Sequence, residues 1–212
     1  QAARASALVK DFATAEKASQ RSLLVMLKTP GMYYVESSAY LMVPHSILMY
    51  RARARLAEGK ADEAVRLARE ALAVTPGQTE LVAGMVPALE KLGKKAEADE
   101  LFGLAWSAHR GVLKEYPDSP AARNALALLA VDCRRELDAA LRYAEEAAKA
   151  EPESATFRET LAEVHFRRGD RARAADVMTK LLADDPRNAL YKRQLKRYRS
   201  GPLDSPKPET ED

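Results

Sequence analysis

A spacing of 34 residues recurs along this chain and constrains its fold more than any other feature. Four pairs of small or helix-ending residues have this separation: Gly59 and Gly93, Ala64 and Ala98, Ala140 and Ala174, and Pro152 and Pro186. Between the second and third pairs the phase slips by eight residues, which predicts about two additional helical turns within residues 94–116. A fixed period of this length indicates a repeat protein.

The repeating unit is helical. In the stretch "ADEAVRLAREALAVTP", residues 61–76, the side chains of Ala64, Ala68, Ala71 and Leu72 fall on one face of a helix that stops at Pro76. The whole chain of 212 residues is 47% hydrophobic with only nine glycines, and no window has the alternation of a strand. The sequence therefore predicts an all-α fold.

Each unit consists of a helix, a short turn, a second helix and a proline, and such a unit resembles the tetratricopeptide repeat (TPR) family. The signature positions of the first unit hold Leu48, Ala52, Gly59, Ala64, Ala71, Leu72 and Pro76, and those of the fourth hold Leu161, Ala162, Gly169, Ala174, Leu181 and Leu182. The resemblance implies a right-handed superhelix of antiparallel helix pairs. We expect a helical extension over residues 1–44, repeats at 45–76, 79–117 (with the inserted turns), 120–152 and 155–186, a capping helix at 187–199, and a disordered tail at 200–212.

The alanines of each repeat are expected where its two helices come closest together. In TPR-like packing, the two helices of a unit approach most closely where small residues face each other, and the distance between helices depends on those side chains. We expect Ala52 to lie against Ala64 and Ala162 against Ala174. Stacking of the units then forms a continuous core that no single unit has.

Some positions depart from the family pattern. Arg51 and Arg55 replace large apolar residues, so they should face an acidic or solvated neighbour such as Glu36. Pro87 lies inside the first helix of the second unit, which it should kink. The third unit has arginine and glutamate, rather than glycine, at the turn between its helices.

In the family, the first helices of successive units line a groove that holds a peptide. Matching positions give ten candidate partner-binding residues: Met49, Arg53, Glu80, Ala83, Glu90, Leu129, Asp132, Glu159, Glu163 and Phe166. The set is rich in acids, so the resemblance implies a partner segment that is apolar with basic flanks. Met49, Leu129 and Phe166 would be its anchors.

The flanks offer two further surfaces. Residues 32–44 are dense in aromatics, and Tyr33, Tyr34 and Tyr40 either cap the first repeat or form an interface. In "RNALYKRQLKRYR", residues 187–199, the apolar and basic side chains separate onto two sides of a helix. A capping helix has this pattern, and so does a phosphate-binding stripe over residues 192–199.

Several function classes have no support in the sequence. The net charge of +3 does not indicate a nucleic-acid partner, and no apolar run is long enough to span a membrane. His45, His109, His165 and Cys133 have no catalytic or metal-ligand spacing, and His165 occupies an aromatic packing position in the fourth repeat. We expect no enzymatic activity, no cofactor and no metal site. The single cysteine fits a reducing compartment, but the sequence does not indicate a localisation.

The sequence predicts a protein-protein interaction module that binds a protein or peptide partner in its groove. Two alternatives from other classes stay open: a structural or oligomerising scaffold that contacts a second copy through the tyrosine segment or the region of Trp106, and a binder of anionic surfaces through residues 192–199.

Overall fold

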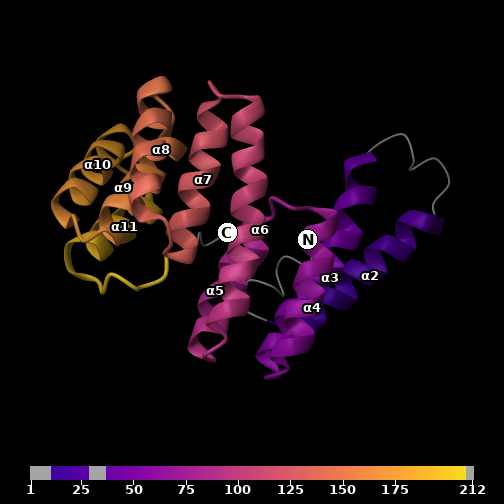
Figure 1. Cartoon of the computed structure of the whole chain (residues 1–212). Coiled ribbons are helices and arrows are strands. Elements are labelled where there is room, and N and C mark those ends of the chain that lie inside the picture. The colour runs from indigo at the N-terminus through magenta and orange to yellow at the C-terminus, as the bar shows by residue number, and fades with distance from the viewer. Residues whose placement is uncertain (1–10, 29–36, 209–212) are drawn as a thin grey trace. The chain divides into compact units, whose positions relative to one another are not determined.

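The structure is a computed structural model that describes residues 11–28 and 37–208. The chain divides into two compact units, residues 1–108 and 109–212. Within the described residues every regular element is an α-helix and none is a strand (Figure 1), which confirms the predicted all-α class. The residues of the tyrosine segment up to Glu36, including Tyr33 and Tyr34, lie outside the described part of the chain.

The first helix of unit 1 in the described residues is α2 (Phe12–Lys28), which packs against α3 (Ser37–Ala57). Next come α4 (Ala61–Val74), α5 (Thr79–Lys91) and α6 (Lys95–Glu115), whose last turns belong to unit 2. Helix α3 carries Pro44 internally and so runs across the boundary expected at residue 45. Arg51 Nε lies 2.8 Å from the Glu16 carboxylate of α2, so the acidic neighbour of this arginine comes from the preceding helix.

Unit 2 contains α7 (Pro120–Cys133), α8 (Leu137–Ala150), α9 (Ala155–Arg167), α10 (Arg171–Asp184) and α11 (Ala189–Ser200). Successive helices pack against each other, and α7 also contacts α9. Short polar side chains cap the helix starts: Ser119, Ser154, Asp170 and Asn188 each accept a hydrogen bond from a backbone N–H three residues later.

The turns between the paired helices have residues with positive φ angles, and most of these residues are glycines. Gly59, Gly93 and Gly169 have φ angles of 77°, 73° and 88°, a conformation that side chains disfavour. In the pair without glycine, Arg134 and Glu136 adopt the same left-handed region with φ of 55° and 52°. The turn geometry is therefore kept at a cost in backbone strain of about 1 kcal/mol per residue.

The small residues at the expected helix contacts are all buried. Ala52, Ala64, Ala162 and Ala174 have no exposed surface. In unit 2, Ala162 and Ala174 belong to one core cluster with Phe166, Met178, Leu181, Tyr191, Leu195 and Tyr198. His165 is also buried, as its packing position predicted.

Pro87 is accommodated within α5, which continues to Lys91. The largest difference from expectation concerns the end of the chain. Residues 201–208, expected to be disordered, follow α11 and make specific contacts with α7, α9 and α11.

Candidate functional site

In unit 1, the candidate residues lie on α3 and α5, the first helices of their pairs, and we call this surface the first-helix face of unit 1. Arg53 is its central charged group. Its guanidinium carbon lies 4.1 Å from the centre of the Phe12 ring, and Nη1 lies 3.4 Å from Oε1 of Glu80. Burial lowers the pKa of Arg53, and the negative charge of Glu80 partly opposes that shift.

A cavity of about 420 Å³ opens beside Arg53. It is lined by Phe12, Arg53, Leu56, Ala57, Gly84, Ala88, Lys91 and Leu92. A Cβ atom on Gly84 would lie 3.1 Å from Nε of Arg53, so the glycine leaves room for the guanidinium on this surface. The cavity combines apolar walls with two cationic side chains, which suits a segment with both apolar and acceptor groups.

The remaining candidates of unit 1 differ in exposure. Glu80 and Glu90 are exposed, Ala83 is half-buried, and Met49 is buried with 3% of its surface exposed. Met49 packs inward because α2 covers this side of α3, where a first repeat would otherwise be open. It is therefore not available as an anchor for a partner.

In unit 2, α7, α9 and α11 form the equivalent surface, the first-helix face of unit 2. Leu129 and Phe166 are fully buried, and the expectation that they anchor a partner is wrong because neither side chain is exposed. Phe166 lies beneath α11: the Tyr198 ring centre is 5.0 Å away and the Arg197 guanidinium 4.5 Å away. The helix expected as a cap thus covers the aromatic side chain.

Glu163 is buried on this face and is fully engaged by its neighbours. Arg197 donates to both carboxylate oxygens, at 2.7 and 2.8 Å, and the Tyr198 hydroxyl donates at 3.0 Å. Arg167 Nε lies 2.7 Å from Oε1. Burial by itself would raise the pKa of Glu163, but the Arg197 hydrogen bonds and the nearby positive charges of Lys207, Arg197 and Arg167 outweigh it and lower the pKa.

Glu159 and Asp132 are half-buried and also have partners. The Tyr191 hydroxyl donates to Glu159 at 2.9 Å. Burial raises the pKa of Glu159, while that hydrogen bond and the charge of Lys207 oppose the rise. Burial and the same carboxylate raise the pKa of Tyr191 to about 12. Asp132 accepts a hydrogen bond from Lys207 Nζ at 2.6 Å.

Residues 201–208, which we call the tail segment, lie on the first-helix face of unit 2. Arg167 donates to the backbone carbonyl of Leu203, and Arg134 donates to that of Asp204 at 2.7 Å. Arg197 donates to the Ser205 carbonyl and hydroxyl, both at 3.0 Å. Arginines from α9, from the end of α7 and from α11 thus bind successive residues of a non-helical peptide.

Gly201 directs the tail segment onto this face. Its N–H donates to the Arg197 carbonyl at 2.7 Å, and a Cβ atom at this position would lie 2.8 Å from the same oxygen. A turn then follows, in which the Ser205 N–H donates to the Pro202 carbonyl at 3.0 Å. A side chain at residue 201 would force this exit from α11 to change.

Sequence reasoning did not assign Arg134 or Arg167 to a site, and it placed Arg197 only in the alternative phosphate-binding stripe over residues 192–199. A signal was present for Arg197, because it lies 34 residues after Glu163, the period of the repeat. Residues one period apart occupy equivalent positions on neighbouring first helices. Opposite charges at such positions therefore indicate an ion pair between repeats.

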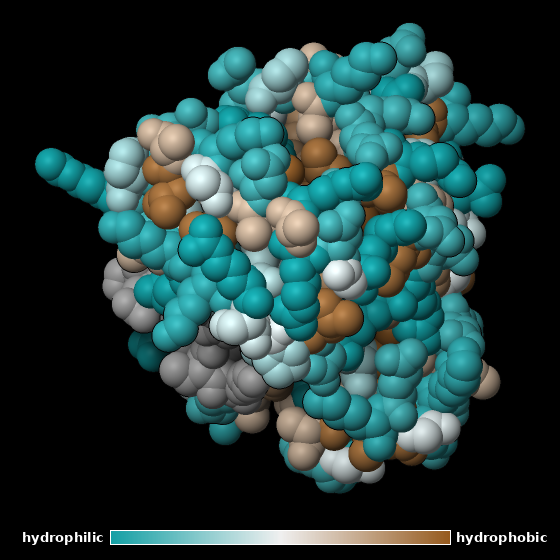
Figure 2. Space-filling view, turned by 90° about the vertical axis from the view of Figure 1, so that its left-hand side faces the viewer, coloured by the Kyte–Doolittle hydropathy of each residue, from teal (hydrophilic) through white to brown (hydrophobic). Residues whose placement is uncertain are grey.

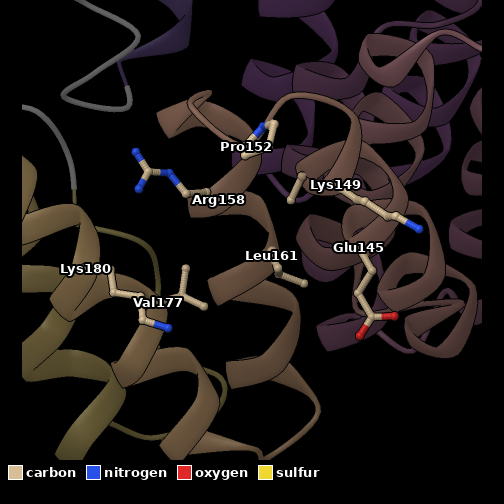
Figure 3. A pocket seen from close by; sticks show the side chains of 8 residues that line it. Glu145, Lys149, Pro152, Arg158, Leu161, Val177 and Lys180 are labelled. Atoms are coloured by element: carbon tan, nitrogen blue, oxygen red, sulfur yellow. The ribbon is translucent and has the colours of Figure 1, made fainter.

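A second cavity lies in unit 2, between α8, α9 and α10, and has a volume of about 310 Å³ (Figure 3). Leu161 and Val177 lie toward its centre, and the charged ends of Lys149 and Arg158 point to opposite sides. Arg158 pairs with Asp184 at 2.7 Å. These charges do not converge on one point, so this cavity is less suited to specific recognition than the cavity beside Arg53.

The surface of the molecule indicates the kind of contact that a partner would make. In the view of Figure 2 the face is mostly hydrophilic, with small and separate hydrophobic areas. Large contiguous apolar patches mark many docking sites, and this face has none of that kind.

The described residues form neither a metal-ion cluster nor a membrane-spanning helix. No group of three or more His, Cys, Asp or Glu side chains in residues 11–28 and 37–208 is arranged to hold a metal ion. Among the same residues, none of the helices has the length and hydropathy to cross a membrane.

Comparison with known proteins supports a repeat fold. A family model described as tetratricopeptide repeat matches residues 134–197, which includes most of unit 2. A crystal structure of a tetratricopeptide repeat protein from Parabacteroides merdae ATCC 43184 is similar, with 15% identity and a TM-score of 0.47. The similarity covers 92% of this chain and 69% of that chain. A search of curated proteins found no match.

Proposed function

We propose that this tetratricopeptide-repeat protein is an interaction scaffold that binds an extended peptide segment of a partner on its first-helix faces. The family match over residues 134–197 supports an interaction scaffold in general. Repeat folds of this family are generally non-catalytic, and we propose no enzymatic role.

The observation that carries the proposal is the tail segment on unit 2. Three arginines and Asp132 hold a non-helical peptide there, chiefly through its backbone carbonyls. Side chains that bind backbone carbonyls accept many sequences, whereas a single acid such as Asp132 adds selection for a cation. A surface with these contacts suits an extended segment of another protein equally well.

Unit 1 supports the same role with different chemistry. Arg53, Glu80, Ala83 and Glu90 remain the candidate residues there, around the cavity beside Phe12. The exposed Glu80 lies 3.4 Å from the partly buried Arg53, whereas Asp132 and Glu163 have cations at 2.6–2.8 Å. A partner carboxylate that replaces Glu80 at Arg53 costs little, because exposed ion pairs contribute at most about 1 kcal/mol.

The structure favours this role over binding of an anionic surface through residues 192–199. Arg197 lies in the interior of unit 2, with only 8% of its surface exposed, and is neutralised by Glu163. The basic stripe therefore has one cation fewer than the sequence suggests. Assembly with a second copy of the chain stays open as an alternative, and light scattering tests it.

Selection from a displayed library of random peptides tests the proposal. The full chain with Lys207→Glu serves as bait, because that change releases the tail segment from Asp132. The affinity of one selected peptide is then measured by fluorescence anisotropy for further variants of the same bait. We expect Asp132→Asn and Arg134→Ala to weaken binding about ten-fold each, since each removes a charge-assisted hydrogen bond.

The matched controls are Lys149→Ala and Lys180→Ala, which line the cavity of Figure 3. We expect both to change the affinity less than two-fold. The proposal is contradicted if no peptide is selected, or if the control variants lose affinity while the Asp132 and Arg134 variants keep it.

A further inference from the structure

The tail segment complements its binding face in a specific way. The guanidinium groups of Arg134, Arg167 and Arg197 are donors only, and a proline contributes a carbonyl acceptor without an N–H. The tail segment, "GPLDSPKP", contains three prolines, at positions 202, 206 and 208. The carbonyls that accept from these arginines are those of Leu203, Asp204 and Ser205, and the Pro202 carbonyl accepts from Ser205 within the segment's own turn.

Lys207 provides the second element of recognition. Its Nζ lies 2.6 Å from Oδ1 of Asp132, and about a third of its side chain is exposed. Its charge also acts on Glu159 and Glu163, whose pKa values it lowers. The cation thus lies among three carboxylates from α7 and α9, two of which already have other donors. A neutral side chain at this place would leave Asp132 half-buried without its cation.

Leu203 lies at the other end of the segment. One of its methyl groups is 3.9 Å from the place that a Cβ atom on Gly169 would occupy, and 40% of the residue stays exposed. This contact is loose compared with the ion pair at Lys207. The lysine therefore defines the segment more than the leucine does.

We propose that the tail segment is an intramolecular competitor: it occupies the first-helix face of unit 2 and excludes a partner segment of the same chemistry, a non-helical peptide with a turn and a lysine for Asp132. This inference rests on the proposed function, of which it names the partner class and the regulation. A partner gains access by displacing residues 202–208, and a change at Lys207 that weakens the Lys207–Asp132 pair increases its access.

The competition has a predictable size. The tail segment follows α11 directly, so its effective concentration at the face is in the millimolar range. If the tail segment alone binds the open face with a Kd of about 100 μM, a partner peptide binds the native chain about ten-fold more weakly than it binds the open face. A tighter competitor segment produces a larger ratio.

The test uses a fluorescently labelled synthetic peptide of residues 201–212 and full-length chains. Anisotropy gives its affinity for the native chain and for the Lys207→Glu chain, in which the new carboxylate repels Asp132. We expect the Lys207→Glu chain to bind the peptide about ten-fold more tightly than the native chain. In the peptide itself, Lys207→Ala should weaken binding, whereas Lys207→Arg should keep it.

The control is Lys149→Glu, which makes the same change of charge on α8 and should behave as the native chain. Circular dichroism and the unfolding midpoint establish that the variants keep their fold. Equal affinity for the native and Lys207→Glu chains overturns the inference, and so does the absence of binding to both at millimolar peptide. In either case the library selection can still succeed, so failure of the competitor is distinguishable from failure of the scaffold.

Discussion

Arg197 of α11 donates to both carboxylate oxygens of Glu163 in α9, at 2.7 and 2.8 Å, and the two residues stand one repeat period apart in the sequence. Both side chains are buried, with 7% and 2% exposed. The pair joins the last helix to the repeats and also orients the guanidinium toward the Ser205 carbonyl. One ion pair therefore serves both the fold and the candidate site.

Removal of one partner of this pair should destabilise unit 2 strongly. In Arg197→Met, Glu163 stays buried with Arg167 as its remaining cation, and we expect the free energy of unfolding to fall by about 3 kcal/mol. Urea denaturation at pH 7 measures it. The double variant Glu163→Leu with Arg197→Met should recover only part of the loss, because Arg167, with 7% of its side chain exposed, then loses its carboxylate partner. A loss below about 1 kcal/mol in the single variant contradicts the account of the pair.

The close approach of α9 and α10 depends on the small size of Ala174. Enlargement of this buried residue in Ala174→Leu should overpack the core cluster and lower the free energy of unfolding by about 1–3 kcal/mol. Ala172→Leu on the same helix is the matched control, since Ala172 is exposed and its change should be within about 0.5 kcal/mol. Equal effects of the two substitutions would mean that the close approach of α9 and α10 does not depend on the size of residue 174.

His165 should make stability depend on pH. Burial lowers its pKa below the usual 6.5, with Arg173 and Arg168 acting in the same direction and Asp170 and Glu145 opposing. As the pH falls, the unfolded chain takes up this proton before the folded chain does, so the free energy of unfolding decreases below about pH 6.5. The contribution of His165 to this decrease ends once the pH is below the pKa of His165 in the folded chain.

Denaturation curves at pH 8 and pH 5.5 measure this dependence. The drop between the two should be smaller in His165→Phe, which keeps an aromatic side chain and removes the titrating group. An unchanged drop in that variant assigns the pH dependence to other groups.

The turn between α7 and α8 should gain stability from glycine. Glu136 has φ of 52°, a conformation that costs a side chain about 1 kcal/mol. We expect Glu136→Gly to raise the free energy of unfolding by about 0.5–1 kcal/mol, whereas Glu153→Gly, at an exposed turn residue without positive φ, should lower it. Thermal unfolding of both variants distinguishes relief of backbone strain from a general effect of glycine. Destabilisation by both variants would show that Glu136 is unstrained.

The helices were predictable because their signals are local. Gly59, Gly93 and Gly169 mark the turns, and Pro76, Pro152 and Pro186 lie just beyond helix ends, as the period of 34 requires. The anchors were mispredicted for Met49 and Phe166 because the helices that cover them, α2 and α11, lie outside the regular repeat. A repeat pattern describes which face a residue takes, but not which flanking element covers that face.

The position of the tail segment could not be predicted from the sequence, for a different reason. Its prolines and acids are typical of a disordered segment, and nothing within residues 201–208 indicates a binding partner. Its partners, Arg134, Arg167 and Asp132, come from two helices that only the fold brings together. Long-range recognition of this kind has no local sequence signal.

Backbone amide dynamics of the tail segment test the central claim most directly. Heteronuclear NOE values of Leu203, Asp204, Ser205 and Lys207 are recorded by NMR in the full chain, without and with a saturating peptide from the library selection. The account predicts values close to those of the helices without the peptide, and a fall to values typical of a mobile chain once the peptide binds. A segment that is mobile before any peptide is added, or that stays ordered at saturation, would contradict it.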